Sequence, residues 1–317
     1  MTAGGVRDLR SGRASRGRRL DVMAQPGRLK IGIISAGKVG TALGGALRNA
    51  GHTIIGAYAA SEDSRDRLDA MLPGVPAREP EEIVGAADAV ILAVPDSELA
   101  GLVGGLAKLD AWRQGQVVVH TAARFGTGVL DPAARAGAIP LALHPAMTFT
   151  GTSLDIARLQ GCPMAVTGAS LYLPIAQAMA AEMGGEPVVI EEEDRPLYHA
   201  ALTHASSHLA TVLTQAQRML AAAGVTDPAG MLATLIDSAV EGARRGGEAR
   251  LTGPAALGDT AAIRDDLLSL RGLAATGDDG DILPSYRALS RATAERANRR
   301  RLLGDHAAEA VRQALED

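Results

Sequence analysis

The sequence predicts an α/β protein in which a doubly wound, mainly parallel sheet is followed by an all-α second half. Seven short apolar runs come first, and segments of helical character separate most of them, as is typical of parallel strands joined by helices. The runs are continuously apolar rather than alternating, which indicates that both faces of the sheet are covered. They are Leu29–Ile34, Thr53–Ala59, Asp88–Val94, Gln116–His120, Ile139–Leu143, Pro163–Thr167 and Pro187–Ile190.

The strand pattern stops after the acidic run Glu191–Asp194. One long helical pattern covers 196–223 and ends at Gly224, and further helices are predicted at 229–245, 260–275 and 284–303, with a short one at the end. A chain of 317 residues is longer than one hydrophobic core usually serves. We therefore predict a disordered basic tail at 1–27, a sheet domain at 28–193 and a helical domain at 194–317.

Composition excludes several classes of protein. Apolar residues make up 47% of the chain, but Trp, Tyr and Phe number only 1, 4 and 2, so the cores must be built from alanine and aliphatic side chains. The formal charge of −4 argues against nucleic acid as a partner. No run approaches the roughly 18 apolar residues of a membrane span. The single cysteine, Cys162, excludes an internal disulfide and fits a reducing compartment, so a cytoplasmic protein is expected.

The first 27 residues are rich in Arg, Gly and Ser and have no apolar stretch of the kind that a secretory signal needs. A disordered tail and an arginine-rich transit peptide both fit this composition, and Met23 offers an alternative start. We exclude the segment from the fold.

A glycine-containing turn lies between the first strand and the helix after it. Ser35-Ala36-Gly37-Lys38-Val39-Gly40 keeps the second and third glycines of the pattern G-x-G-x-x-G and has Ser35 in the first position. In a Rossmann dinucleotide-binding unit, Gly37 would let the backbone approach a pyrophosphate and Gly40 would let helix and strand pack closely. The N–H groups at the helix start would face the phosphates. We predict that Ser35, Ala36, Gly37, Lys38, Val39 and Gly40 bind a nicotinamide cofactor, although a fold that has lost its nucleotide would look the same.

The end of the second strand favours NADP over NAD. NAD sites usually place an acidic residue here to hold the ribose hydroxyls, but this strand runs into Ala60-Ser61 with no acid before Glu62. Ser61 and Arg65, with Arg67 beyond, suit a 2′-phosphate. The two arginines could instead belong to a solvated helix face.

The run Asp88–Asp96 fits the fourth strand of a Rossmann fold and its exit. Because the chain after that strand passes the ribose and pyrophosphate, Val94, Pro95 and Asp96 are predicted cofactor neighbours. Asp96 could instead cap the next helix, which is a common use of aspartate.

Histidines at two strand ends are the candidate proton donors, because the chain has no lysine after Lys108. Hydride transfer to a carbonyl or imine needs a donor near the developing anion, and histidine titrates near neutral pH. His120 and Thr121 end one strand, and His144 ends the next. Ligands of open α/β sheets bind beyond the carboxyl ends of the strands. We predict that His144 is catalytic, that His120 contacts substrate and that Thr121 contacts the cofactor; a structural role for either histidine stays open.

The long helix carries a second group of polar side chains. His204 and His208 are four residues apart and share a face. They could form a metal pair, but no third ligand at suitable spacing is visible, so we predict a buried polar stripe that contacts substrate and continues to Thr211 and Gln215. Ser207 lies beside this stripe and could bond a substrate oxygen.

Asp259 follows a turn at Leu251–Gly258 and precedes the next predicted helix. It could be that helix's N-cap, or its carboxylate could bind substrate and assist proton transfer.

Six segments together resemble one known family, the bacterial Rossmann-like oxidoreductases with a family-specific helical second half of unknown function. The segments are IGIISAGKVG, AVPDSEL, VVVHTAA, LHPAMTF, YHAALTHASSHL and LTGPAALGD, and the resemblance covers residues 29 to about 300. It implies a cofactor loop at Ser35–Gly40 and cleft residues at His120, His144 and Asp259.

The chain departs from the family pattern at four places. Ser35 replaces a glycine, Ala122-Ala123 replace Ser-Gly, Ser207 stands where asparagine is frequent, and Leu257 stands where arginine is usual. More distantly, the layout is similar to pyrroline-carboxylate reductases, prephenate dehydrogenases and ketopantoate reductases. The segment His144–Met147 is similar to a prephenate dehydrogenase segment whose histidine contacts substrate.

These observations lead to one functional hypothesis and one alternative. The chain is expected to be a homodimeric NADP-dependent oxidoreductase that reduces a small 2-oxo acid or imine, with a ketopantoate-like substrate suggested by the resemblance. His144 would donate a proton to the substrate or polarise its carbonyl group, while Asp259 and Ser207 would position the substrate. The alternative is a dinucleotide-binding sensor or scaffold without turnover.

Overall fold

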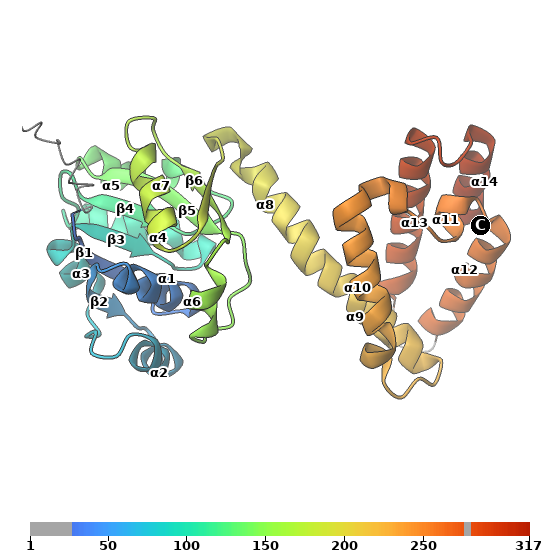
Figure 1. Cartoon of the computed structure of the whole chain (residues 1–317), viewed down its shortest axis with the longest axis horizontal. Coiled ribbons are helices and arrows are strands. Elements are labelled where there is room, and N and C mark those ends of the chain that lie inside the picture. Colours follow the sequence, from blue (N-terminus) through green and yellow to red (C-terminus); the bar gives the residue numbers. More distant parts are fainter. Residues whose placement is uncertain (1–26, 276–279) are drawn as a thin grey trace, which may run out of the picture. The chain divides into compact units, whose positions relative to one another are not determined.

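The computed structural model describes residues 27–275 and 280–317, and the predicted tail lies almost wholly outside them. The chain divides into two compact units, the first ending at His199 and the second running from Ala200 to Asp317 (Figure 1). The division lies close to the domain boundary proposed at residue 193. In the described part of the chain, no helix is both long and apolar enough to cross a membrane.

The first unit is built on a seven-stranded sheet in the order β2-β1-β3-β4-β5-β6-β7. Every neighbouring pair is parallel except β5 and β6, so the prediction of a mainly parallel, doubly wound sheet is confirmed. The strands are β1 (Lys30–Ile34), β2 (Thr53–Tyr58), β3 (Ala89–Leu92), β4 (Val117–His120), β5 (Ile139–Pro145), β6 (Pro163–Thr167) and β7 (Glu186–Val189).

Helices cover both faces of the sheet because its apolar strands need cover on both sides. Alternate residues of β3 show this: Ala89 and Ile91 belong to one buried cluster, and Val90 and Leu92 to another. The first cluster includes residues of α1 (Lys38–Asn49), α2 (Glu62–Met71) and α7 (Leu173–Glu182), and Ile156 of α6 (Leu154–Arg158) packs against it. The second includes residues of α3 (Pro80–Ala86), α4 (Asp96–Lys108) and α5 (Asp131–Arg135).

The strand predicted over Asp88–Val94 is the third along the chain, not the fourth. It nevertheless pairs with β1 on the side opposite β2, where it brings its exit beside the turn after β1. A parallel register of Ile34 with Leu92 sets the two exits level at the carboxyl edge of the sheet. The turn after β1 and the exit of β3 therefore lie side by side, although the prediction that this strand is the fourth in the chain was wrong.

After β7, the elements of residues 190–275 and 280–317 are helices joined by turns. A 3₁₀ turn (Glu192–Asp194) leads into α8 (Arg195–Thr203), a π-helical turn (His204–His208) and α9 (Leu209–Ala222). The single helix predicted at 196–223 is thus interrupted by one wider turn. The helices that follow are α10 (Pro228–Gly246), a 3₁₀ turn (Gly247–Arg250), α11 (Pro254–Leu257), α12 (Thr260–Ala274), α13 (Ile282–Arg299) and α14 (Asp305–Glu316). Helix α13 ends before the predicted residue 303 because Arg301 has a left-handed φ of 59°.

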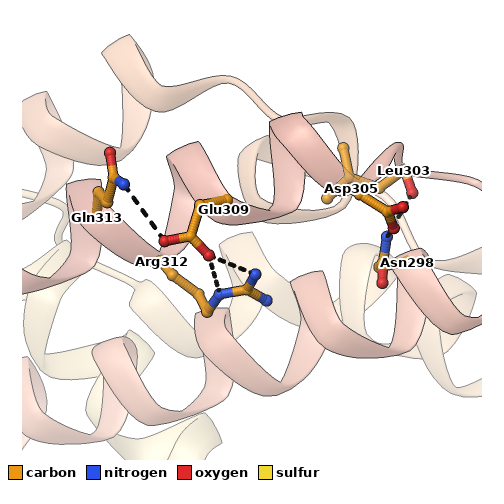
Figure 2. Close-up of polar contacts among 6 residues, drawn as sticks. All are labelled: Asn298, Leu303, Asp305, Glu309, Arg312 and Gln313. Carbon is orange, nitrogen blue, oxygen red and sulfur yellow. Dashed lines mark hydrogen bonds and ion pairs between the residues drawn. The ribbon is translucent and has the colours of Figure 1, made fainter.

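The core of the second unit lies among α11, α12, α13 and α14. Its buried cluster includes Ile263, Leu267, Ala294, Val311 and Leu315. At the turn between the last two helices, the Asn298 side-chain amide donates to the Leu303 carbonyl and the Asp305 carboxylate, while Glu309 bonds to Arg312 and Gln313 (Figure 2). The two Asn298 bonds hold the chain reversal, whereas those of Glu309 lie within α14. Helices α9 and α10 contribute nothing to this buried cluster.

Candidate active site

The turn after β1 has the shape of a phosphate-binding loop, and its third glycine is sterically required. A Cβ on Gly40 would lie 2.1 Å from the Ser35 carbonyl oxygen, so no other residue fits there without moving the backbone. The Ala36 N–H donates to the Tyr58 carbonyl at 2.7 Å and ties the loop to the end of β2. Helix α1 begins at Lys38 with Gly37 as its N-cap, so its first N–H groups face out of the loop.

Ser35 adopts a backbone conformation that glycine usually supplies. Its φ is 88°, in the left-handed region where a Cβ costs roughly 1–3 kcal/mol. The Ser35 hydroxyl oxygen would lie 3.3 Å from a Cβ on Gly37, so the serine side chain stands over the loop. The serine therefore preserves the turn of the glycine pattern and adds a hydroxyl to it.

A cavity of about 280 Å³, here called the loop hollow, opens beside this turn. It is lined by the turn itself, by the end of β2 and the start of α2, and by the exit of β3. Of the predicted cofactor residues, Ser35, Ala36, Gly37, Ser61, Val94 and Pro95 line it, whereas Lys38, Val39, Gly40, Arg65, Asp96 and Thr121 do not. Its charged lining residues are Arg67 and Glu98, so Arg67 rather than Arg65 faces the hollow.

Asp96 and Thr121 flank the hollow without lining it. Asp96 is the first residue of α4 and makes no side-chain capping bond, since Pro95 holds the cap position; the capping alternative is therefore wrong. One Asp96 carboxylate oxygen lies 3.9 Å from the Arg124 Nε. The Thr121 N–H and hydroxyl both donate to the Leu92 carbonyl, which binds the exit of β4 to the end of β3.

His120 is a structural residue. It is fully buried, its Nε2 donates to the Gly126 carbonyl at 2.8 Å, and its Nδ1 accepts from the Ala122 N–H at 3.2 Å. Burial, opposed by the Gly126 bond, lowers the pKa of His120 to about 4. Because neither nitrogen is left for a ligand, the prediction that His120 contacts substrate is corrected.

The loop that His120 supports is held from a second side by Glu192. The carboxylate accepts from the N–H of Thr127 at 2.7 Å and of Gly128 at 3.0 Å, and from the Thr127 hydroxyl. Burial opposes ionisation, but these bonds and the charge of Arg195 outweigh it and lower the pKa of Glu192. Glu192, which belongs to the acidic run after the last strand, thus also holds the loop after β4 in place.

His144 differs, because its partner is a side chain. It is half-buried near the carboxyl end of β5, and its Nδ1 lies 2.9 Å from the Tyr198 hydroxyl on α8. Burial, followed by the charges of Arg195 and His199, lowers the pKa of His144 to about 4, so the ring is neutral at pH 7. A neutral imidazole that bonds a phenol can pass or accept a proton at its other nitrogen.

Arg195 lies behind this pair and is fully buried. Its Nε donates to the Thr167 hydroxyl at 2.8 Å and its Nη2 to the Ala165 carbonyl at 3.2 Å, with longer bonds to the carbonyls of Ala123 and Ala142. Its guanidinium carbon is 5.8 Å from the centre of the Tyr198 ring. A buried cation satisfied by neutral oxygens leaves a positive field around Tyr198 and His144.

The predicted buried stripe on the long helix is wrong for three of its four residues. His204, His208 and Thr211 are exposed, and only Gln215 is buried, where its side-chain amide donates to Asp281 and Ser285. The shared face of the histidines is confirmed, since their Nδ1 atoms lie 3.0 Å apart across the π-helical turn. Ser207, in the same turn, is also exposed. In the residues that the structure describes, no three His, Cys, Asp or Glu side chains gather as a metal site.

Asp259 is the N-cap of α12. Its carboxylate oxygen accepts from the Ala262 N–H at 3.1 Å, as expected of a capping aspartate. The second carboxylate oxygen is still available to a ligand, so capping and substrate binding are compatible.

Two residues of this region were not predicted as site residues from the sequence: Arg195 and Tyr198. The available signal was a charge pattern, since Arg195 is the last charged residue before 22 uncharged positions, 196–217. Tyr198, in turn, is one of only 4 tyrosines in the chain.

Two family models match the chain. A Rossmann-like domain model matches residues 16–145, and a model described as a domain of unknown function, DUF2520, matches residues 162–293. These matches confirm the resemblance to proteins with a Rossmann-like first half and a helical second half of unknown function. A search of curated proteins found no match to the chain.

Solved structures share the fold at low sequence identity. A protein from Bacteroides fragilis assigned as an NADP oxidoreductase is 23% identical over 84% of this chain and 98% of its own, with a TM-score of 0.69. An imine reductase from Pseudomonas sp. is 18% identical over 87% and 99%, with a TM-score of 0.61. A pyrroline carboxylate reductase from Plasmodium falciparum, solved with NADP bound, is 12% identical over 89% and 98%, with a TM-score of 0.53.

Proposed function

Because the chain joins a Rossmann-like domain to a DUF2520 domain, we propose that it is an NADP-dependent oxidoreductase that reduces a small 2-oxo acid or an imine. One observation carries the proposal. The bonded pair His144–Tyr198 lies at the end of β5, on the same carboxyl edge of the sheet as the loop hollow after β1. Parallel neighbouring strands β1, β3, β4 and β5 connect the two places, and a dinucleotide bound at this edge would extend from one toward the other.

The cofactor side of the proposal rests on the fit of the loop. Gly40 lets α1 pack closely against the turn after β1, and the hollow beside Ser35–Gly37 suits a pyrophosphate at the start of that helix. The absence of an acid at the end of β2 and the presence of Ser61 and Arg67 in the hollow favour NADP over NAD. The NADP named for two of the similar structures supports the same choice.

The proton would come from a relay in the first unit. A bound NADPH supplies a hydride, and the residues of the chain then deliver a proton to the substrate oxygen or nitrogen. The Tyr198 hydroxyl donates to Nδ1 of neutral His144, which leaves the proton on Nε2 for the substrate. As the Nε2 proton passes to the substrate, the Tyr198 hydroxyl transfers its proton to Nδ1, which leaves a neutral imidazole and a phenolate. Burial raises the pKa of Tyr198, and the positive charge of Arg195 acts in the opposite direction to stabilise the phenolate that forms.

Four polar residues of the second unit, considered by themselves, are candidates for substrate contact. We propose this role for Ser207, Asp259, His204 and His208, whose side chains can bond a carboxylate or a carbonyl oxygen. Their exposure leaves them accessible to a ligand. A Ser207→Ala variant is expected to raise KM several-fold with little change in kcat.

The experiment that tests the function is an assay of NADPH oxidation, followed by absorbance, with a panel of 2-oxo acids and cyclic imines. A direct titration with NADPH runs beside it. Consumption of NADPH with one substrate class supports the proposal. The absence of any NADPH binding contradicts it.

A non-catalytic sensor or scaffold is the second candidate, and specific features favour it. Ser35 carries backbone strain in the cofactor loop, and the buried methyl groups of Ala122 and Ala123 fill the exit of β4 where the family has Ser-Gly. Tight NADPH binding without oxidation by any substrate of the panel would support this candidate.

We also propose that the protein is a homodimer through α9 and α10. Helix α9 buries only Gln215 and α10 buries no residue, while Leu209, Val212, Met231 and Leu235 are exposed by 36–65%. The charge-free stretch 196–217 is unusual for a solvent-facing surface, and charged residues are depleted at interface cores. An uncharged apolar face is complementary to its own copy. A monomer in analytical ultracentrifugation at micromolar concentration would contradict this proposal.

We propose a reducing compartment such as the cytoplasm, because the chain has a single cysteine, Cys162, and so no internal disulfide. The thiol is buried and unpaired, and burial raises its pKa, so it stays protonated at neutral pH.

A further inference from the structure

The connection between β5 and β6 folds back against the cofactor loop. Its turn is centred on Gly151, which has a left-handed φ of 87°. A Cβ on Gly151 would lie 3.0 Å from Cγ of Lys38 and 3.1 Å from Nε of Arg67. Gly151 thus lies against the aliphatic stem of Lys38, at the start of α1, and against the guanidinium end of Arg67, which lines the loop hollow.

A buried aspartate builds this turn. Asp155 is fully buried, and its carboxylate accepts from the Thr150 N–H at 3.1 Å, the Thr150 hydroxyl at 2.9 Å and the Gly151 N–H at 2.7 Å. Burial opposes ionisation, but these bonds outweigh it and lower the pKa of Asp155. Its carboxylate is therefore committed to the turn and does not neutralise Lys38 or Arg67.

The connection is also anchored to α1. A Cβ on Gly45 would lie 2.5 Å from Cδ1 of Ile156, so the missing side chain lets Ile156 seat on the helix. The connection is thus fixed at the Gly151 turn, by the bonds to Asp155, and at Ile156, by its packing on α1. The position of Gly151 relative to Lys38 and Arg67 follows from this anchoring.

The two cations are available to an anion. Over residues 27–275 and 280–317, neither Lys38 nor Arg67 forms an ion pair with a carboxylate. Ser61 adds a donor, because its hydroxyl oxygen accepts from the Ser64 N–H and keeps its own hydrogen. The Ser64 hydroxyl already donates to the Ser61 carbonyl. The acid in the hollow, Glu98, lies on the α4 side of the cavity.

We infer that the β5–β6 connection is a wall of the cofactor site: the Gly151 turn, held by Asp155, sets Lys38 and Arg67 to bind the 2′-phosphate of the dinucleotide. The inference rests on the proposed function. A phosphate monoester suits this arrangement because it presents two negative charges and three acceptor oxygens to two cations and a hydroxyl. Asp155 is a positioning residue, and Arg67 takes the place that the sequence suggested for Arg65.

The test is a calorimetric titration of the full-length protein with NADPH, NADH and the probe 2′,5′-ADP. Arg67→Ala should weaken NADPH and 2′,5′-ADP by at least tenfold, since a charge-assisted hydrogen bond contributes about 1.5–3 kcal/mol, and should change NADH by less than twofold. Arg135→Ala, which removes an exposed arginine of α5, is the matched control and should change none of the three.

A second pair of variants tests the connection itself. Asp155→Asn should weaken NADPH binding in the same selective way, and the milder Thr150→Val, which removes one bond to Asp155, should do so by a few-fold. Thr150→Val keeps the fold testable if Asp155→Asn does not fold. Weakening confined to NADPH and 2′,5′-ADP supports the inference.

Three results would overturn it. Equal loss of NADPH and NADH affinity in Arg67→Ala would assign the cations to the pyrophosphate. Selective loss in Arg65→Ala but not in Arg67→Ala would return the role to Arg65. Unchanged selectivity in Thr150→Val and Asp155→Asn would remove the connection from the site. A wild-type protein that binds neither dinucleotide contradicts the proposed function instead.

Discussion

His120 and His144 lie at the ends of neighbouring parallel strands, and both have a pKa of about 4, yet the structure uses them in different ways. His120 is fully buried and bonds the backbone with both nitrogens. His144 is half-buried and bonds the side chain of Tyr198. The partner, rather than the pKa or the place in the fold, therefore decides which histidine can take part in chemistry.

The largest effect is expected at His144. Replacement by alanine removes the proton relay, and a general acid or base contributes typically 10²–10⁴-fold to turnover. We expect His144→Ala to lower kcat by about that factor while NADPH affinity stays within about twofold. Steady-state kinetics and a fluorescence titration measure the two quantities. Undiminished turnover would place His144 with His120 as a structural residue.

The next effect concerns the partner of His144. Tyr198→Phe keeps the ring and removes the hydroxyl that bonds Nδ1, so we expect kcat to fall by roughly 10–100-fold, equivalent to about 1.4–2.7 kcal/mol. Tyr172→Phe, at the start of α7, is the matched control and should keep wild-type kinetics. Equal rates in the two variants would show that the relay does not use Tyr198.

Replacing His120 should lower stability strongly and turnover only slightly, which is the opposite of the effect expected at His144. His120→Ala leaves the Ala122 N–H and the Gly126 carbonyl without their partner, and each unsatisfied buried group costs about 1–3 kcal/mol. We expect the free energy of unfolding in urea to fall by at least about 2 kcal/mol, with turnover per folded molecule far closer to wild type than in His144→Ala. A stable but inactive His120→Ala would reverse the assignment of the two residues.

The smallest effect is a pH dependence of stability. The folded-state pKa of His120, about 4, lies below its ordinary value of 6.5, so the unfolded chain binds the proton more tightly. This residue's contribution is fully present above pH 6.5 and is lost as the pH falls toward 4, by about 2 kcal/mol between pH 7 and 5. Urea midpoints at the two pH values measure it.

The His120→Ala variant provides the comparison for that measurement. Having lost the titrating group, it should show a shallower decline of stability between pH 7 and 5 than the wild type. A decline of the same size in both proteins would mean that His120 does not titrate as the structure implies.

The sheet was predictable because each strand carries its own signal. Continuous apolar runs such as those of β3 and β4 need cover on both faces, and the two buried clusters supply it. Gly40 was predictable for a similar reason, since the requirement for glycine arises from Ser35, five residues earlier.

The site was less predictable because its contacts are distant in the chain. Arg195 is buried by carbonyls and a hydroxyl from β5, β6 and the exit of β4, and the uncharged stretch after it does not identify these distant partners. The bond from Tyr198 to His144 spans 54 residues. Arg65 is exposed, whereas Arg67 lines the hollow. The two residues are two positions apart on α2, so they lie on nearly opposite sides of the helix, and the sequence does not tell which side faces the hollow.

The position of Lys38 offers a chemical handle on the cofactor site. The chain has only three lysines, Lys30, Lys38 and Lys108, and all three are exposed. An amine-selective reagent would therefore modify one side chain at the start of α1 and two that lie elsewhere in the first unit. Protection of Lys38 by a dinucleotide, read by peptide mass spectrometry against the other two, would report occupancy of the loop without any knowledge of the substrate.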